Sequence, residues 1–142
     1  MSTAATIAHA ATPTKTLHIA LWVAQVGLAA MFAMAGSMKS FTPIAELATQ
    51  LPLAAEWPVA AVRFIGISEL AGAIGLILPA ATRIKPWLTP LAAFALLVVM
   101  VLAALFHLSR GEVGAIGINV MLGAAAAFVA WGRSKRAPIV AR

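Results

Sequence analysis

Four long apolar segments, separated by short polar stretches, dominate the hydrophobic pattern of the chain. They cover about residues 17–38, 58–80, 87–107 and 114–131. A helix needs about 20 apolar residues to cross the roughly 30 Å hydrocarbon core of a bilayer. Each segment is apolar on nearly every face and lacks the period-two alternation of a barrel strand. The pattern therefore predicts an all-α integral membrane protein, a four-helix bundle in which every helix spans the membrane.

The segments outside this bundle are short. Residues 1–16 form an N-terminal tail and residues 134–142 a basic C-terminal tail, and we expect both to be poorly ordered. The membrane domain then extends over residues 17–133.

The stretch between the first two spans carries a shorter pattern of its own. Thr42 is a suitable N-cap for a helix, and Pro43 a suitable first helical residue. Ile44, Leu47 and Leu51 would share one face of that helix. We therefore expect a short helix on the membrane surface, serving as a covering loop or as a functional lid.

Composition supports the membrane assignment and narrows the chemistry. Of the 142 residues, 63% are hydrophobic and 10% are charged, which is too little polar surface for a soluble globule. The absence of cysteine excludes a disulfide framework, thiol catalysis and cysteine-ligated metal. The net charge of +6 sits at the ends of the apolar segments rather than in one patch, which argues against nucleic acid.

The distribution of basic residues predicts the topology. Seven of the ten Lys and Arg residues fall on one side of the predicted bundle, namely Lys15, Arg83, Lys85, Arg133, Lys135, Arg136 and Arg142. The positive-inside rule then places both termini in the cytoplasm and residues 39–57 and 108–113 outside the cell (inner) membrane. One alternative stays open, because Ala33-Met34-Ala35 resembles a signal-peptidase site. Cleavage there would leave three spans, although the first apolar segment is longer than a usual signal peptide requires.

Glu69 is the sharpest candidate for function. It lies about 16 Å into the second predicted span, where a charge costs about 2.5–3.5 kcal/mol on insertion scales. Arg63 lies six residues earlier and points about 120° away, so each group needs a partner on another helix, or Arg63 extends to the outer lipid headgroups instead. An unpaired Glu69 would be largely protonated and suited to proton handling beside a quinone. A paired Glu69 would be a buried ion pair that fixes helix register.

Further polar residues fall at the outer ends of the other spans. Together with Glu69 they define a candidate ligand or proton site, expected to face one outward-opening cavity: Glu69, Arg63, Lys39, His107, Glu112 and Asn119. The alternative is that most of them are ordinary interfacial residues, with Asn119 a hydrogen-bond tie between helices.

No cofactor site of the chain's own is visible in the sequence. His18 and His107 are expected near opposite membrane faces, which excludes a bis-histidine haem. No His/Asp/Glu cluster has metal-ligand spacing, so no metal site is predicted, and no phosphate loop or Ser/His/Asp arrangement occurs. Whether the protein is an enzyme stays open, because redox chemistry would need a borrowed cofactor such as a quinone.

Two stretches resemble the DoxX and DoxX-like family. Ala35-Gly36-Ser37-Met38-Lys39-Ser40-Phe41 is similar to the family's "aG..K.f" signature. Arg63 to Pro79 is similar to its "R..G..E..gg..lllp" second helix. The resemblance points to Lys39, Arg63, Gly66, Glu69 and Gly72 as family positions. Helix packing is the expected role of the glycines, namely Gly36, Gly66, Gly72 and Gly75.

The resemblance implies a four-span inner-membrane protein connected with quinol oxidase, thiosulfate:quinone oxidoreductase or oxidative-stress complexes. The leading hypothesis is an accessory subunit of such a redox system, with a polar outer-leaflet pocket centred on Glu69. The alternatives are a quinone-binding oxidoreductase component and, less favoured, a small transporter. Expected partners are the lipid bilayer, a quinone, a soluble redox protein and a second copy of the chain.

Overall fold

The computed structural model describes residues 14–142, and its regular structure over that range is entirely helical. The helices are α1 (Lys15–Phe41), α2 (Ile44–Gln50), α3 (Pro52–Glu56), α4 (Val59–Thr82), α5 (Leu88–Ser109) and α6 (Val113–Trp131), followed by a π-helical turn at Gly132–Arg136. Four of these, namely α1, α4, α5 and α6 with its π-helical turn, are long and apolar enough to cross a membrane. The prediction of four apolar spanning helices is confirmed, with ends that differ from the predicted ones by up to a few residues.

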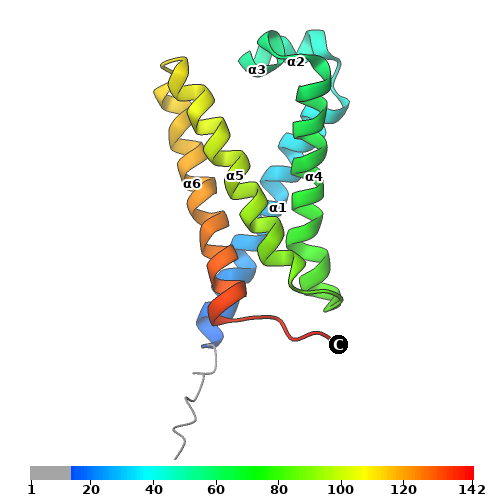
Figure 1. Cartoon of the computed structure of the whole chain (residues 1–142), viewed down its shortest axis with the longest axis vertical. Coiled ribbons are helices and arrows are strands. Elements are labelled where there is room, and N and C mark those ends of the chain that lie inside the picture. The colour runs from blue at the N-terminus through cyan, green and yellow to red at the C-terminus, as the bar shows by residue number, and fades with distance from the viewer. Residues whose placement is uncertain (1–13) are drawn as a thin grey trace, which may run out of the picture.

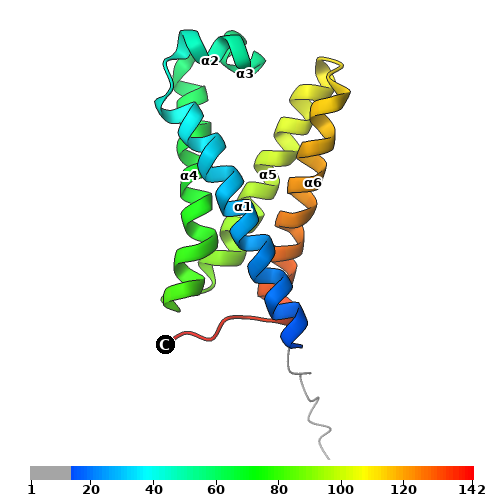
Figure 2. The same cartoon turned by 180° about the vertical axis from the view of Figure 1, so that it is seen from behind.

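The four long helices pack as two antiparallel pairs (Figure 1). The first pair is α1 with α4, the second is α5 with α6, and α4 also packs against α5. Helix α1 crosses the bundle diagonally, so its end lies beside the start of α4 and its beginning beside the end of α6 (Figure 2). Helices α2 and α3 lie across one end of the bundle, which we call the α2–α3 end. The chain ends at the opposite end, the tail end.

Each long helix buries only a narrow stripe. In α1 the buried residues Leu21, Gln25, Leu28, Phe32 and Gly36 recur every three or four positions, the spacing of one helix face. Stripes from all four helices meet in one apolar core, formed by Leu28, Phe32, Ala73, Leu76, Ala93, Leu96, Met100, Ala126 and Val129. The opposite faces expose large apolar side chains such as Phe64 and Phe94. A surface of this kind is suited to lipid.

Helix α1 contributes to this core along most of its length. Leu28 and Phe32 are buried in the core cluster, and Leu21 is fully buried. Removal of residues 1–35 as a signal peptide would therefore strip the bundle of one side of its core.

The segment between α1 and α4 differs from the sequence prediction. Thr42 does not cap α2; it closes α1 instead, with its backbone N–H donating to the carbonyl of Met38 at 3.1 Å. Pro43 occupies the N-cap position of α2 without a side-chain cap. The predicted single helix is two short ones, because the extended backbone at Leu51 separates α2 from α3. The expected apolar contact exists nevertheless, since Leu47 is fully buried.

The C-terminal tail is also different from the expectation of a loose segment. Residues 137–142 run back across the tail end of the bundle toward the α4–α5 turn (Figure 1). The Arg83 guanidinium donates to the Val140 carbonyl at 3.0 Å, and the Arg142 backbone N–H donates to the Arg83 carbonyl at 3.1 Å. Ala137 is fully buried. The predicted N-terminal tail, apart from Thr14 onward, lies outside the described residues.

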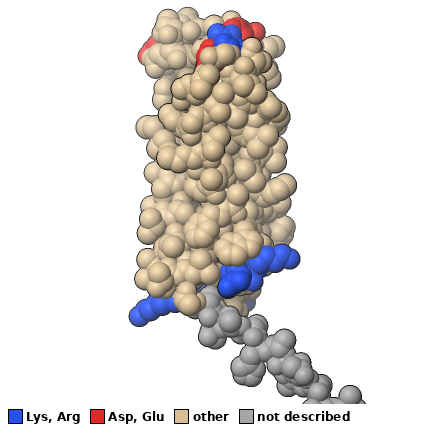
Figure 3. Space-filling model, turned by 90° about the vertical axis from the view of Figure 1, so that its left-hand side faces the viewer, with Lys and Arg blue, Asp and Glu red and all other residues tan. Residues whose placement is uncertain are grey.

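Charge is confined to the two ends of the visible surface. In Figure 3 a broad uncharged band separates Lys and Arg at the tail end from a mixture of basic residues and Glu at the α2–α3 end. An apolar band between polar rims is the surface expected of a bilayer-embedded bundle.

Two glycines bring α1 and α4 into close contact. A Cβ atom placed on Gly36 would lie 2.7 Å from the carbonyl oxygen of Gly66, and one on Gly66 would lie 2.9 Å from the carbonyl oxygen of Gly36. No residue with a Cβ atom fits such a backbone approach without a shift. Gly72 and Gly75 serve the neighbouring contact, where a Cβ would meet Leu96 and Ala92 of α5.

This contact predicts opposite effects for two glycines of the same helix. Gly36→Ala forces a methyl group against backbone, and we expect it to destabilise the bundle by about 1–3 kcal/mol. Gly27→Ala is the matched control, because its Cβ has nothing within 4 Å. It should be neutral or stabilising by up to about 1 kcal/mol through helix propensity. Thermal unfolding in detergent micelles measures both, and equal effects of the two substitutions would refute the close contact.

Candidate functional site

The charge of Glu69 is matched by a lysine from the neighbouring helix. The Lys39 ammonium lies 2.8 Å from both carboxylate oxygens of Glu69 and donates to each. The Glu69 side chain is 3% exposed and that of Lys39 is 15% exposed. Glu69 belongs to the buried stripe of α4, between Gly66 and Gly72, and Lys39 stands in the last turn of α1. The pair therefore joins two antiparallel helices inside an otherwise apolar contact.

Arg63 supports this pair without touching Glu69. Its guanidinium donates to the carbonyl of Lys39 at 2.6 Å and to the carbonyl of Thr42 at 2.7 Å. The last carbonyls of a helix have no partner within the helix, and Arg63 supplies one to each of these two. It thereby holds the backbone of Lys39 in place, which fixes where the lysine side chain starts. Glu69 and Arg63 thus each find a partner on another helix, as their angular separation requires.

The family-like motif residues form one joint between α1 and α4. Gly36 and Gly66 set the backbone distance, Lys39 and Glu69 form the ion pair, and Arg63 closes the end of α1. A Cβ on Gly66 would also lie 2.8 Å from the Cβ of Lys39, so this glycine makes room for the lysine itself. The sequence spacing of these five motif residues reflects a single three-dimensional contact between the two helices. We call this contact the α1–α4 joint.

Two of the other predicted site residues form a separate group at the α2–α3 end. The imidazole of His107 lies 2.7 Å from Glu112, and Arg110 donates to Glu112 at 2.6 Å. Arg110 also pairs with Glu56 at the end of α3. The hydrogen bond from Arg110, followed by that from His107, lowers the pKa of Glu112 below its ordinary value. This group ties the α5–α6 turn to α3, assisted by an edge-to-face contact of Trp57 with Phe106 at 6.1 Å.

Asn119, the sixth predicted residue, stands alone between α5 and α6. It is 9% exposed, and its amide nitrogen has no hydrogen-bond partner in the part of the chain that the structure describes. The structure thus places the six candidates in three groups, the α1–α4 joint, the His107–Glu112 group and Asn119.

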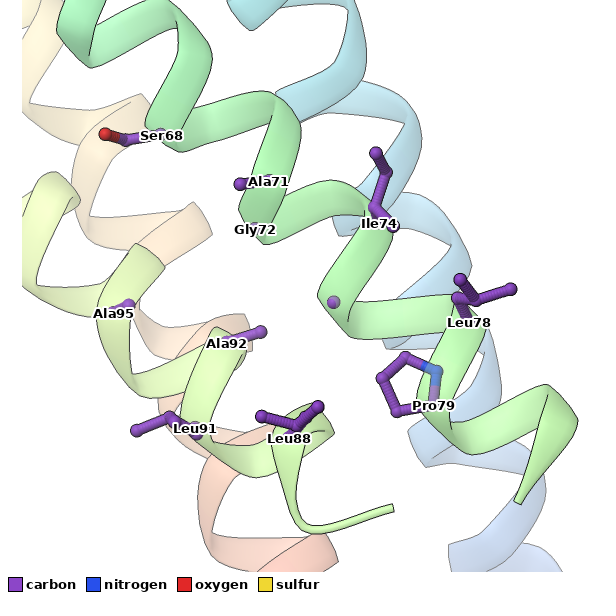
Figure 4. Close-up of a pocket in the computed structure, with 11 residues that line it drawn as sticks. Ser68, Ala71, Gly72, Ile74, Leu78, Pro79, Leu88, Leu91, Ala92 and Ala95 are labelled. Atoms are coloured by element: carbon purple, nitrogen blue, oxygen red, sulfur yellow. The ribbon is translucent and has the colours of Figure 1, made fainter. Parts of the chain in front are cut away.

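A surface groove lies apart from the six candidates. It has a volume of about 540 Å³ and runs between α4 and α5 (Figure 4). Its walls are small and apolar, including Ala71, Gly72 and Ala92. Its one hydroxyl, that of Ser68, donates to the Phe64 carbonyl of its own helix at 2.8 Å. The groove suits an apolar chain, and its lining has no charged side chain that could bind a ligand.

A further polar cluster lies at the tail end, and the sequence does not predict it. Arg133 is 3% exposed and donates to the Gln25 side-chain oxygen at 2.6 Å and to the Ala137 carbonyl at 3.2 Å. Gln25 is fully buried and donates in turn to the Leu76 carbonyl at 2.7 Å. One amide thereby connects α1, α4 and the end of α6. Its position on the buried stripe of α1, four residues after Leu21, is the signal that could have revealed it.

His18 lies at the edge of this tail-end cluster. Its Nε2 atom is 3.2 Å from the indole nitrogen of Trp22, and its Nδ1 atom is 3.1 Å from Arg133. Both neighbours are donors, whereas a neutral imidazole has one acceptor nitrogen. His18 therefore accepts from one of the two at a time. It lies at the opposite end of the bundle from His107, as the argument against a bis-histidine haem assumes.

The chemistry open to these groups is limited by their pairing. Among residues 14–142 no group of three or more His, Cys, Asp or Glu residues could hold a metal ion. Both oxygens of Glu69 are engaged by Lys39. The α1–α4 joint can fix the register of the two helices.

Comparison with known sequences identifies one family. The model of the DoxX-like family matches residues 23–129, which covers all four long helices in large part. No curated protein and no solved structure matches the chain. The matched range contains the whole α1–α4 joint and ends before Arg133, so the tail-end cluster lies partly outside it.

The ion pair in the α1–α4 joint predicts that removing one charged side chain destabilises the bundle more than removing both. Lys39→Met leaves the Glu69 carboxylate unpaired among apolar residues, and breaking such a pair costs about 3–5 kcal/mol. Adding Glu69→Leu removes the stranded charge, so the double variant should recover much of the lost stability. Unfolding in detergent, analysed as a double-mutant cycle with Ser68→Ala as the neighbouring control, measures the coupling. A double variant whose loss equals the sum of the two single losses would contradict the pairing.

Proposed function

Because the chain belongs to the DoxX-like family, we propose that it is an accessory integral membrane subunit of a redox system, quinone-linked or concerned with oxidative stress. In this role it carries out no catalysis alone. It holds a partner or cofactor-bearing protein at the membrane, and the α1–α4 joint maintains the shape on which that association depends.

The observation that supports the proposal is that Lys39 engages the whole carboxylate of Glu69. A carboxylate reserved for a quinone head group would keep at least one oxygen directed into a cavity. Here both oxygens accept from Lys39, and Glu69 lines neither the groove between α4 and α5 nor the one between α5 and α6. This favours a structural use of the pair within a subunit over a quinone-binding oxidoreductase component.

The proposed location is the cell (inner) membrane, with both termini in the cytoplasm. Support comes from the tail end, where Lys15 begins α1, Arg83 and Lys85 lie in the α4–α5 turn, and the basic C-terminal tail follows α6. The positive-inside rule assigns such an end to the cytoplasm. The α2–α3 end, with Glu46, Glu56 and Glu112, then faces outward.

Affinity purification from native membranes tests the accessory role. We expect the tagged chain to retain membrane redox proteins in mild detergent, and Glu69→Gln to lower their recovery about tenfold, corresponding to about 1.4 kcal/mol of lost association. Ser68→Ala, one residue away and bonded only within its own helix, is the control that should keep the wild-type recovery. The readouts are mass spectrometry of the retained proteins and extraction of quinone from the same eluate.

The possible results separate the hypotheses. Redox proteins retained by the wild type and lost with Glu69→Gln support the accessory role. Quinone recovered in a one-to-one ratio with the chain, and lost with Glu69→Gln, would replace it by the quinone-binding component. A chain that carries neither redox proteins nor quinone would refute both.

The absence of cysteine allows the orientation to be tested directly. A single cysteine introduced at Glu46, in α2, should react with a membrane-impermeant maleimide added outside intact cells. One introduced at Lys135 should react only after the cells are opened. Labelling in the reverse order would overturn the proposed topology.

A further inference from the structure

The groove between α4 and α5 ends beside two basic residues. At the tail end its lining finishes with Pro79 of α4 and Leu88 of α5 (Figure 4). Arg83 follows Pro79 by about one helical turn. Lys85 precedes Leu88 by three residues. Both basic residues lie in the turn that joins the two helices, so an apolar groove and a positively charged turn adjoin each other.

The length of the groove corresponds to the depth of one leaflet of lipid. Along α4 the lining extends from Ser68 to Pro79, about 16 Å at 1.5 Å per residue. One leaflet provides about half of the roughly 30 Å hydrocarbon core of a bilayer, which is nearly the same depth. The flanks of the groove include Ile74, Leu78 and Leu91, whose side chains are 60%, 56% and 50% exposed. The groove therefore faces the space that lipid tails occupy.

The two basic side chains of the turn keep donors available. Arg83 uses its Nε atom to donate to the Val140 carbonyl at 3.0 Å, and its two terminal nitrogens have no hydrogen-bond partner among residues 14–142. Lys85 is exposed, and its ammonium pairs with no acidic side chain of the described residues. The four acidic residues of the chain all lie outside the turn and the groove lining, at Glu46, Glu56, Glu69 and Glu112. The positive charge at the end of the groove thus has no acidic side chain beside it in the turn.

The backbone of the turn makes the presence of these two side chains informative. Arg83 and Lys85 have φ angles of 61° and 48°, in the left-handed region. Glycine adopts this conformation freely and commonly ends a helix in it, whereas residues with a Cβ atom adopt it with strain. The positive-inside rule favours basic residues near this end of the bundle, but it does not call for them at these two backbone positions. A use for the side chains themselves accounts for both residues.

We propose that the α4–α5 groove and its basic turn bind one anionic phospholipid, with an acyl chain in the groove and the phosphate at Arg83 and Lys85. A guanidinium with free terminal nitrogens and an ammonium are the donors that a phosphate accepts from. Apolar packing alone would favour no particular lipid, since bulk lipid tails are as apolar as the groove. The basic turn therefore supplies the selectivity, and the groove supplies the position. The proposal does not rest on the redox role and holds whether or not that role is correct.

Native mass spectrometry of the full chain in a mild detergent tests the lipid site. The probes are dioleoyl phosphatidylglycerol, which is anionic, and dioleoyl phosphatidylcholine, which has the same tails and no net charge. We expect one phosphatidylglycerol to be retained per chain, with an affinity about tenfold or more above that of phosphatidylcholine, because two basic residues face the anionic head group.

Two substitutions of matched charge test the basic turn. Lys85→Gln and Lys135→Gln each remove one positive charge from an exposed lysine at the tail end, and only Lys85 adjoins the groove. Lys85→Gln should weaken phosphatidylglycerol binding about fivefold, the factor that corresponds to about 1 kcal/mol for one basic residue at a membrane surface. Lys135→Gln should leave the binding unchanged.

Two substitutions of matched size test the groove. Ala71 is an exposed residue of the groove lining, and Ala30 is an exposed residue of α1 that lines no part of it. Ala71→Leu should weaken phosphatidylglycerol binding about tenfold or more, because leucine occupies the space that the acyl chain requires. Ala30→Leu should have no effect. Ala95→Leu fills the groove from α5 and repeats the test, and unchanged lipid-free unfolding temperatures exclude misfolding as the cause.

The opposing results are equally definite. Equal retention of phosphatidylglycerol and phosphatidylcholine would show that the head group is not recognised and would overturn the proposal. Equal weakening by Lys85→Gln and Lys135→Gln would reduce the effect to net charge, and Ala71→Leu without effect would remove the groove from the site. Release of phosphatidylglycerol by inorganic phosphate at constant ionic strength would assign the basic turn to a free anion instead of a lipid.

Discussion

A carboxylate inside an apolar helix is the constraint on which the rest of this structure depends. Glu69 has to be matched by a positive charge, and the nearest one comes from Lys39 on the antiparallel neighbour. For the lysine to reach it, α1 and α4 must approach more closely than residues with a Cβ atom allow. Gly36 and Gly66 make this approach possible. Arg63 then fixes the backbone from which the lysine extends. One electrostatic requirement thereby determines the identity of five residues.

The second polar contact complements the first. Apolar helices in contact can slide along each other at small cost, because one row of methyl groups resembles the next. The α1–α4 joint fixes α1 near its end, and Gln25 with Arg133 fixes it near its beginning. Leu28 and Phe32 fill the space between with apolar packing. The two contacts together determine the axial position of α1 against both of its neighbours.

The sequence predicts the spans well, because hydrophobic length is a local property. It also predicts that Glu69 matters, since the cost of a charge in a span does not depend on which helices are neighbours. It leaves the partner of Glu69 open between Lys39, Arg63 and a proton, because helix rotation is decided by packing. The bonds of Arg63 to backbone carbonyls could not be predicted, as every residue has a carbonyl. From the sequence Arg133 counts among the basic residues that indicate topology, because counting charges by side ignores burial.

The pairing of the helices follows the order of the chain, and this has a consequence for biogenesis. The partners α1 and α4 are successive spans, as are α5 and α6. Lys39 and Glu69 can therefore enter the bilayer together, as a hairpin whose opposite charges cancel before the later helices are synthesised. The Gln25 side chain can likewise donate to Leu76 of α4 within this hairpin, whereas its oxygen has to wait for Arg133, which follows the last span. The first helix can thus be tied to α4 early and to the end of α6 only when the final helix has been synthesised.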